Sequence, residues 1–294
     1  MTWALLVIGL YIGGIALVVG IGMAILVASR ERPWRPDRAA LAVFAREVAA
    51  HALFLLLHPL GWVQLSPRPF LPMQEVRPPV LLVPGFGMNR SCMFFMSLAL
   101  RRRGWRWVWS INHRAPGGPR GVAAFASHLE AQVDLLRRVS GSERVDLVCH
   151  SMGGLVAAQA LQHGALAGKV RRVVTLGTPY QGTQMAAFGF WLPEHRDLFP
   201  DSEIVRRLED NPAPTTAIWS RSDHLVVPSG RAEPDWVRHG PHRSWELESL
   251  GHLEMLTSVR VFAAVKLALL GQDATDEDAV ASSLIAWAGE PGVA

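Results

Sequence analysis

The sequence predicts an α/β domain with a mostly parallel sheet and helices on both faces, preceded by a transmembrane helix. Residues 2–29 carry no charged side chain, and short apolar runs alternate with helical segments from residue 80 onward. Hydrophobic residues make up 50% of the chain and charged residues 18%, below the ~25% usual in soluble domains. A chain this apolar buries too much surface to stay disordered.

Length, cysteine content and charge narrow the functional classes. With 294 residues, the chain holds one catalytic-sized domain plus a smaller segment. Two cysteines, Cys92 and Cys149, exclude a disulfide-stapled scaffold and a multi-cysteine zinc module. The net charge of +4 is spread along the chain. We therefore expect a basic solvated face or attraction to anionic lipid, and no nucleic-acid partner.

Residues 1–29 are interpreted as a retained transmembrane anchor. The uncharged stretch exceeds the ~20 residues that span a bilayer. No basic side chain precedes it, in contrast to a cleaved signal peptide. Arginines follow it, which places Met1 outside and residue 30 onward inside. The expectation is an integral, single-pass protein of a bacterial inner membrane.

Residues 30–65 are interpreted as a basic segment followed by an amphipathic helix. The apolar run over 39–63 also carries Glu47, His51 and His58 at helical spacing. Because ionisable groups are costly at mid-bilayer, we expect this helix to lie in the membrane interface or to dock on the domain core. If this second helix spans the bilayer instead, the two helices form a hairpin and the domain lies on the outer side. The side of the membrane that the domain faces therefore stays open.

Small residues recur four positions apart in the first helix, and such spacing lets two helices approach closely. The bilayer and a second copy of the chain, forming a homodimer, are therefore expected partners. The small residues are Gly9, Gly13, Ala16, Gly20, Ala24 and Ala28.

The rest of the chain divides into a linker, a domain and a tail. Five prolines over 66–79 predict a stiff linker, because proline favours extended backbone. The catalytic domain is expected over 80–271, followed by an acidic, loosely ordered tail over 272–294. Within the domain, the predicted strands are 80–83, 105–111, 145–149, 170–176 and 215–220. One predicted helix follows the glycine-rich turn at 84–87 and ends near residue 103. Three more are predicted over 122–139, 152–163 and 253–270.

A serine directly after a buried strand is the first candidate for catalysis. The strand ending at Cys149 leads into Ser151, and Gly153 opens the following helix. A strand–serine–helix turn of this kind is a nucleophile elbow, which needs small residues two positions before and after the serine. Cys149 and Gly153 meet that need. A serine that merely caps the helix is the alternative interpretation.

Four segments, in order, resemble the bacterial lipase-like group of α/β-hydrolase-fold lipases and esterases. Cys149-His-Ser-Met-Gly-Gly154 resembles the nucleophile motif of that group. Leu82-Val-Pro-Gly-Phe-Gly87 resembles its His-Gly-x-Gly oxyanion loop, with Pro84 in place of the histidine. Leu176-Gly-Thr-Pro-Tyr-Gln-Gly-Thr183 resembles its Leu-Gly-Thr-Pro-His-x-Gly-Thr segment, which comes after the strand that follows the nucleophile motif. The acid and histidine loops match at 219–228 and 251–256. The resemblance covers roughly residues 78–270 and implies the α/β-hydrolase fold.

The order of the residues along the chain selects the base. In this fold the order is serine, then Asp or Glu, then histidine. A histidine suits the base, because its pKa lies near working pH. His252 fits the order, with a glycine before it and an apolar helix after it. His239 and His242 remain as alternatives.

The acid is expected at Asp223, which closely follows the strand predicted over 215–220. Catalytic groups collect in loops at the ends of sheets. The alternative acids lie in a segment without strand character. They are Asp197, Asp201 and Asp210.

Two further parts of the site are expected from the chemistry. Backbone N–H groups of Phe86 and Met152 would form the oxyanion hole, because negative charge develops on the carbonyl oxygen. A cap over about 180–213 would supply an apolar acyl pocket. Its substrate-binding residues would be Phe188, Phe190 and Trp191, unless the aromatic side chains simply pack the insertion onto the sheet.

We expect no cofactor and no metal site. His239 and His242 have ligand-like spacing, but no cysteine or carboxylate completes a set. The Gly-x-Gly at 85–87 lacks the third glycine of a dinucleotide fingerprint.

These expectations predict a membrane-anchored serine hydrolase that cleaves lipophilic esters such as acylglycerols or phospholipids through Ser151, His252 and Asp223. The same machinery also suits an acyltransferase, a thioesterase or an amidase. A catalytically silent membrane scaffold is the alternative from a different class.

Overall fold

The computed structural model describes residues 2–29, 38–69, 77–113, 121–189, 192–208, 212–238 and 240–272. The basic run at 30–37, residues 70–76 of the predicted linker and all but the first residue of the predicted tail lie outside these ranges.

Six parallel strands form one sheet in the order β2-β1-β3-β4-β5-β6. Strands β1 and β3 are buried along their whole length, as expected when helices cover both faces of a parallel sheet. The strands are β1 (Val80–Val83), β2 (Val108–Ser110), β3 (Val145–His150), β4 (Val170–Leu176), β5 (Thr215–Trp219) and β6 (Arg243–Glu246).

The strand order reverses beside β1, which pairs with β2 on one side and β3 on the other. In open α/β sheets, ligands bind at the carboxyl ends of the strands where the order reverses. Val83 is the last residue of β1 and lies in register with Cys149 of β3. The loop after β1 therefore opens beside the turn after β3.

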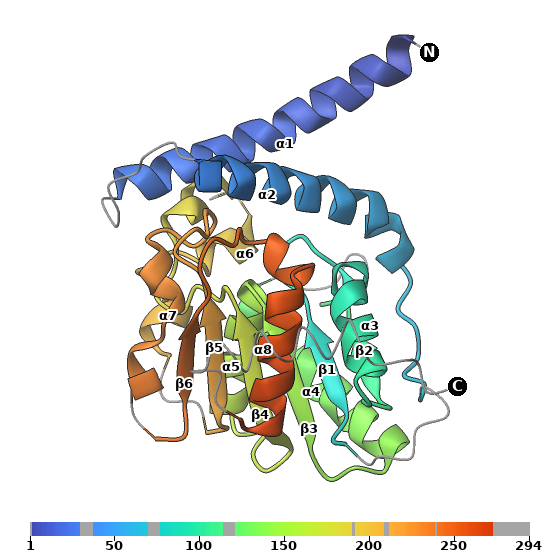
Figure 1. Ribbon diagram of the computed structural model, residues 1–294. Helices are drawn as coiled ribbons and strands as arrows, with labels where there is room; N and C mark the ends of the chain where they lie inside the picture. Colours follow the sequence, from blue (N-terminus) through green and yellow to red (C-terminus); the bar gives the residue numbers. More distant parts are fainter. Residues whose placement is uncertain are drawn as a thin grey trace.

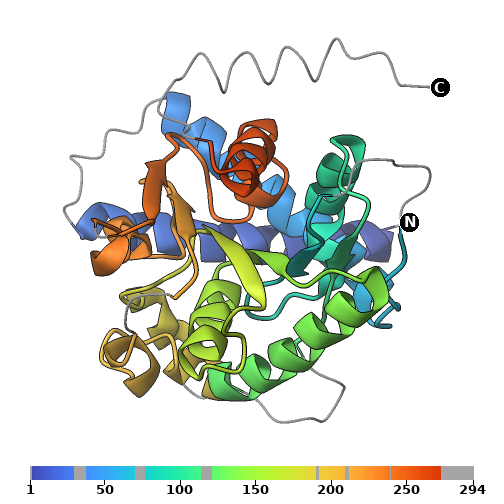
Figure 2. The same cartoon turned by 90° about the horizontal axis from the view of Figure 1, so that it is seen from below.

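Helices cover the two faces of the sheet in separate layers (Figure 2). Helices α4 (Val122–Ser140) and α5 (Met152–Gln162) pack on one face, and α3 (Phe94–Arg102) and α8 (Val259–Leu270) pack on the other. The short helices are η1 (His58–Gly61), η2 (Arg90–Met93), η3 (Gln184–Gly189), α6 (Pro193–Arg196), α7 (Glu203–Arg206), η4 (Ser229–Ala232), η5 (Asp235–Arg238) and η6 (Glu254–Leu256).

Three elements differ from the sequence prediction. Strand β2 is shorter than the predicted 105–111, because Trp105 bends back to donate its backbone N–H to Leu100 and packs in the core. Strand β6 was not predicted, since only Trp245 of its four residues is buried and its pattern is polar. Helix α8 begins at Val259 rather than 253, because the preceding residues form η6.

Two long helices, α1 (Thr2–Ala28) and α2 (Arg38–Leu57), cross one end of the domain (Figure 1). Both meet loops that follow the carboxyl ends of strands. Gly22 of α1 packs on His224, which follows β5, and α2 contacts η2 and η6. The two helices therefore lie over the end of the sheet where ligands bind in this class of fold.

Helix α2 is part of the domain core. It buries Val43, Glu47, Ala50 and Phe54, which recur three or four positions apart on one face. Ala50 and Phe54 join the hydrophobic cluster on the α3 and α8 side of the sheet. Helix α2 therefore packs on the domain through this face.

Both N-terminal helices are long and apolar enough to cross a membrane by length and composition. The qualifying segments are Gly9–Ala28 and Arg38–Gly61, and 11% and 22% of their respective most apolar 18-residue stretches are buried. Core helices of soluble proteins and signal sequences meet the same criterion. Few of the described α1 side chains are buried, whereas α2 has one face covered by the domain.

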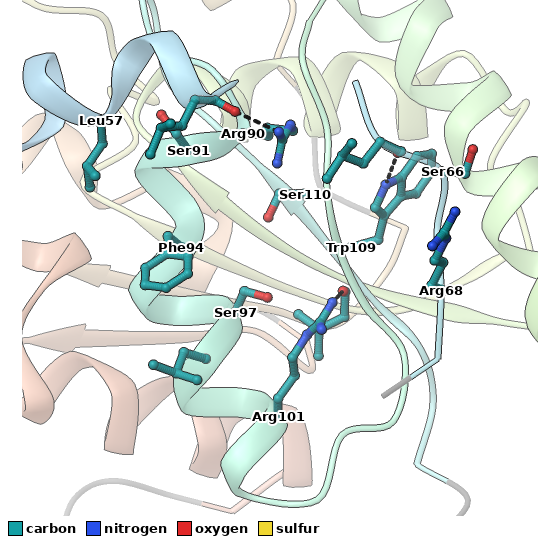
Figure 3. Close-up of a pocket in the computed structure, with 14 residues that line it drawn as sticks. Leu57, Ser66, Arg68, Arg90, Ser91, Phe94, Ser97, Arg101, Trp109 and Ser110 are labelled. Carbon is teal, nitrogen blue, oxygen red and sulfur yellow. Dashed lines mark hydrogen bonds between the residues drawn. The ribbon is translucent and has the colours of Figure 1, made fainter. Parts of the chain in front are cut away.

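A cavity of about 600 Å³ lies between the end of α2, helix α3 and strand β2 (Figure 3). Its lining combines leucines and Phe94 with Arg68, Arg90 and Arg101. Arg90 donates from Nε to the Val63 carbonyl oxygen at 2.6 Å and from Nη2 to that of Leu60 at 2.6 Å. These bonds tie the residues after α2 to the domain. Leu60 and Val63, which come before the predicted linker, are therefore bound to the domain.

Candidate active site

Ser151 occupies a strained turn between β3 and α5. Its φ of 54° and ψ of −129° lie outside the regions that L-residues favour, at a cost of about 1–3 kcal/mol. Two bonds to the segment after β4 hold the turn. The Ser151 N–H donates to the Leu176 carbonyl at 2.8 Å, and Thr178 Oγ1 donates to the Ser151 carbonyl at 2.9 Å. The backbone of Ser151 thus makes a tight turn between strand β3 and helix α5.

The small residues around the turn are required by the loop after β1. A Cβ atom at position 153 would lie 2.6 Å from the Pro84 carbonyl oxygen and 2.7 Å from that of Val83. A Cβ atom at position 85 would lie 2.9 Å from Cβ of Ser151. No side chain fits in either place, so Gly85 and Gly153 let the loop press against the serine.

Asp223 and His252 form a buried pair. Nδ1 of His252 lies 2.7 Å from Oδ2 of Asp223, and both side chains are almost fully buried. Oδ1 of Asp223 accepts the N–H groups of Leu225 at 2.9 Å and Val226 at 3.0 Å. The carboxylate is therefore fixed by its own loop while it holds the imidazole.

The electrostatics of the pair favour its charged form. Burial alone would raise the pKa of Asp223, but the charge and hydrogen bond of His252 hold that pKa below its ordinary value. Burial alone would lower the pKa of His252, but Asp223 and, more weakly, Glu47 hold it above its ordinary value. A protonated His252 is thus stabilised in this site.

Gly177 connects the serine turn to the Asp–His pair. It directly follows Leu176, the acceptor of the Ser151 N–H, and has a φ of +55°. A Cβ atom here would lie 2.9 Å from Oδ2 of Asp223 and 3.1 Å from Nδ1 of His252. Ser151, Asp223 and His252 are thereby brought to the same end of β4.

Two buried histidines support the site, and sequence reasoning missed both. His150 donates from Nε2 to the His252 carbonyl at 3.1 Å, and burial lowers its pKa to about 3. His113 donates from Nε2 to the Pro84 carbonyl at 2.6 Å, and burial lowers its pKa to about 4. His113 precedes Ser151 in the chain, so the residue order used to select the base carries no information on a supporting role for it.

The predicted oxyanion donors flank the serine. Met152 is the first residue of α5, where a backbone N–H has no partner within the helix. Phe86 lies in the loop that Gly85 presses onto Ser151. Its ring packs edge-on against His195 at 4.2 Å between centroids. The backbone of both residues borders the nucleophile turn.

The alternative residues have other positions. His242 accepts the Thr215 N–H at 3.2 Å, at the amino end of β5 and thus opposite Asp223. Asp197 accepts the Val122 N–H at 2.7 Å at the start of α4, and Asp201 is exposed. Asp210 and His239 lie outside the described residues.

The predicted cap is an insertion of short helices. Leu198 and Phe199 pack on the core cluster under α4 and α5, so part of the insertion is packed onto the domain. Phe188 is 52% exposed. Phe190 and Trp191 lie outside the described residues, and the three substrate-binding assignments stay predictions.

A buried carboxylate from α2 enters this region. Glu47 has no solvent exposure, and burial raises its pKa to about 7. Glu47, His51 and His224 each offer one ligand atom, all within 4.8 Å of one another, so they form a set that could hold a metal ion. Sequence spacing did not reveal this set, because His224 comes from a distant part of the chain.

Comparisons with known proteins agree with this architecture. Two solved structures share the fold. The mature form of lipase BlEst2 from Bacillus licheniformis has a TM-score of 0.58 and 17% identity, covering 71% of this chain and 98% of its own. Lipase B from Aspergillus fumigatus has a TM-score of 0.60 and 14% identity, covering 88% of each chain. No curated protein matches the chain in sequence. The pattern of the alpha/beta hydrolase family matches residues 80–291, and the chain belongs to that family.

Proposed function

We propose that this alpha/beta hydrolase is a membrane-anchored serine hydrolase that cleaves lipophilic carboxylic esters. One observation carries the proposal: the Ser151 turn and the Asp223–His252 pair both lie against the end of β4. The strained turn at Ser151 bonds to Leu176. The Asp223–His252 pair lies against the next residue, Gly177.

Acylation follows from these positions. Ser151 Oγ attacks the ester carbonyl carbon while Nε2 of His252 takes the serine proton. The former carbonyl oxygen becomes an oxyanion and accepts the N–H groups of Phe86 and Met152. The bond to the alcohol then breaks, the alcohol leaves with the proton from His252, and the acyl group stays on Ser151.

Deacylation reverses these roles with water. His252 removes a proton from water, the resulting hydroxide attacks the acyl carbon, and Ser151 leaves with the proton that His252 returns. In both steps Asp223 holds Nδ1 of His252 and stabilises the imidazolium. The raised pKa of His252 supports this role.

A lipophilic substrate and a membrane location are supported by the N-terminal helices and the family. Helix α1 presents an exposed apolar surface long enough to cross a bilayer. It lies over the carboxyl end of the sheet (Figure 1), and Ser151 directly follows the carboxyl end of β3. Both solved structures described above are lipases by name.

A fluorophosphonate probe tests the nucleophile directly. The detergent-solubilised wild type is compared with Ser151→Ala and with Ser127→Ala, a control at an exposed position on α4. We expect labelling of the wild type and the control, and none of Ser151→Ala. Equal labelling of Ser151→Ala, or no labelling of folded wild type, would rule out the proposal.

Substrate class is then separated with small substrates. We expect hydrolysis of p-nitrophenyl esters to increase with acyl length. Faster turnover of a thioester or an anilide of the same acyl group would favour a thioesterase or an amidase. Preferential acyl transfer to an added alcohol in water would indicate an acyltransferase.

A further inference from the structure

Helix α2 contacts the loop that carries His252, although α2 lies before the residues that match the family pattern, 80–291. In Figure 1, α2 passes over the amino-terminal end of α8, where this loop lies. Arg46 of α2 donates from Nη2 to the Ser249 carbonyl at 2.8 Å and from Nε to Oε1 of Glu254 at 2.5 Å. The helix therefore holds both ends of a short loop.

Glu47 binds the backbone at the centre of the same loop. Its Oε1 accepts the Leu253 N–H at 2.8 Å, and its Oε2 accepts the Glu254 N–H at 3.0 Å. Both bonds fall within two residues of His252. A carboxylate that accepts two adjacent N–H groups fixes the backbone between them, and here that backbone directly follows the histidine.

Gly251 leaves room for the Glu47 carboxylate. A Cβ atom at Gly251 would collide with the Glu47 carboxylate, so a glycine before His252 is required for the contact. Within the described residues, no Lys or Arg pairs with Glu47. The titratable groups that face it are His51, His224, His252 and Asp223.

We propose that Glu47 is a positioning residue for His252, acting through two hydrogen bonds to the loop and through its negative charge. This inference rests on the proposed function, because His252 must be the base for its position to matter. The N-terminal helix α2 is then part of the active centre, and the family-matched segment alone is incomplete.

The charge of Glu47 contributes when His252 becomes positive. During proton transfer from Ser151 an imidazolium forms, and the Glu47 carboxylate, when it is ionised, is a second anion near it besides Asp223. The influence of Glu47 on the pKa of His252 is upward. Loss of the charge therefore lowers that pKa, and the neutral base persists to lower pH.

The test compares Glu47→Gln with Arg46→Gln in the full-length protein. The two residues are adjacent and bind the same loop, but only Glu47 acts electrostatically on His252. The measurement is the rate of fluorophosphonate labelling against pH, with thermal unfolding as a check on folding. We expect Glu47→Gln to label about 10- to 100-fold more slowly, because small misplacements of a catalytic group cost up to ~100-fold.

The pH profile separates positioning from general loosening of the loop. We expect the midpoint of the acid limb to move to lower pH in Glu47→Gln and to stay at the wild-type value in Arg46→Gln. Equal midpoints in wild type and Glu47→Gln would overturn the proposal. If Glu47→Gln does not fold, Glu47→Asp replaces it. That variant keeps the charge with a shorter reach, so a slower rate at the wild-type midpoint supports the proposal and an unchanged rate overturns it.

Two further outcomes of the labelling experiment separate this inference from the proposed function and from a metal-binding role of Glu47. If wild type is not labelled, the proposed function fails and this inference fails with it. If wild type is labelled but loses labelling in EDTA, Glu47 serves a metal ion together with His51 and His224, and the positioning role is overturned.

Discussion

Helices α1 and α2 are both long and apolar enough to cross a membrane, yet they contact the rest of the molecule differently. Helix α1 leaves Leu10 and Leu17 exposed, and its Gly22 packs against His224 of the domain. Helix α2 inserts Phe54 into the core and places Glu47 beside the loop that carries His252. Overall hydropathy therefore does not identify the role of either helix, whereas the few ionisable residues do.

Deletion gives the largest expected contrast between the two helices. Removal of residues 1–29 should leave a folded protein that the fluorophosphonate probe still labels. Removal of residues 1–63 should abolish folding, because Ala50 and Phe54 leave the core and the loop after His252 loses its carboxylate. Circular dichroism and labelling of both variants in the same detergent check this. Equal behaviour of the two deletions would contradict the contrast.

A single side chain should reproduce part of that effect. Phe54→Ala in α2 should lower the free energy of unfolding by about 3–5 kcal/mol, the usual cost of emptying a buried aromatic site. Leu56 is two residues away and its side chain is 75% exposed, so Leu56→Ala should change the free energy of unfolding by less than about 0.5 kcal/mol. Chemical unfolding followed by tryptophan fluorescence measures both. A small loss in Phe54→Ala would place α2 outside the core.

For α1 the expected effect is on membrane insertion rather than on folding. Leu17→Arg places a charge in the middle of the apolar helix, where Leu17 is 64% exposed. We expect insertion to weaken by about 2.5–3.5 kcal/mol. Labelling at Ser151 in detergent should not change. Carbonate extraction of membranes, with Leu17→Ala as control, measures the change. Unaltered extraction would argue against α1 as an anchor.

The smallest expected effect is on pH dependence. His252 must be neutral to accept a proton, and its pKa is raised, so labelling should rise with pH through a midpoint above 6.5. Below that pH the imidazolium form predominates and labelling is lost. Because the raising groups are Asp223 and Glu47, the profile should be the same with and without residues 1–29. A displaced midpoint in the deletion would show that α1 acts on the site.

Most of the domain could be predicted, because apolar runs and glycine-bounded turns are local patterns. Strand β4 has the predicted bounds, and the structure places Ser151, Asp223 and His252 at one end of the sheet. Strand β6 could not be predicted, because an edge strand with one buried residue lacks an apolar run.

The supporting groups were beyond sequence reasoning for a different reason. Glu47 and Leu253 are 206 positions apart, and His113 and Pro84 are 29 apart. No local pattern links such pairs. Glu47 was recognised only as a charge in an apolar stretch, which suggested docking but not what it would contact.

Gly22 of α1 has a consequence for how the enzyme would face a bilayer. A Cβ atom at this position would lie 2.7 Å from the His224 carbonyl oxygen, so the helix backbone rests directly on the domain. A flexible tether would let the domain tumble beneath the membrane. A helix seated this closely removes most of that rotational freedom. With α1 in the bilayer, as we propose, the domain keeps one fixed orientation and the end of the sheet with Ser151 stays toward the lipid.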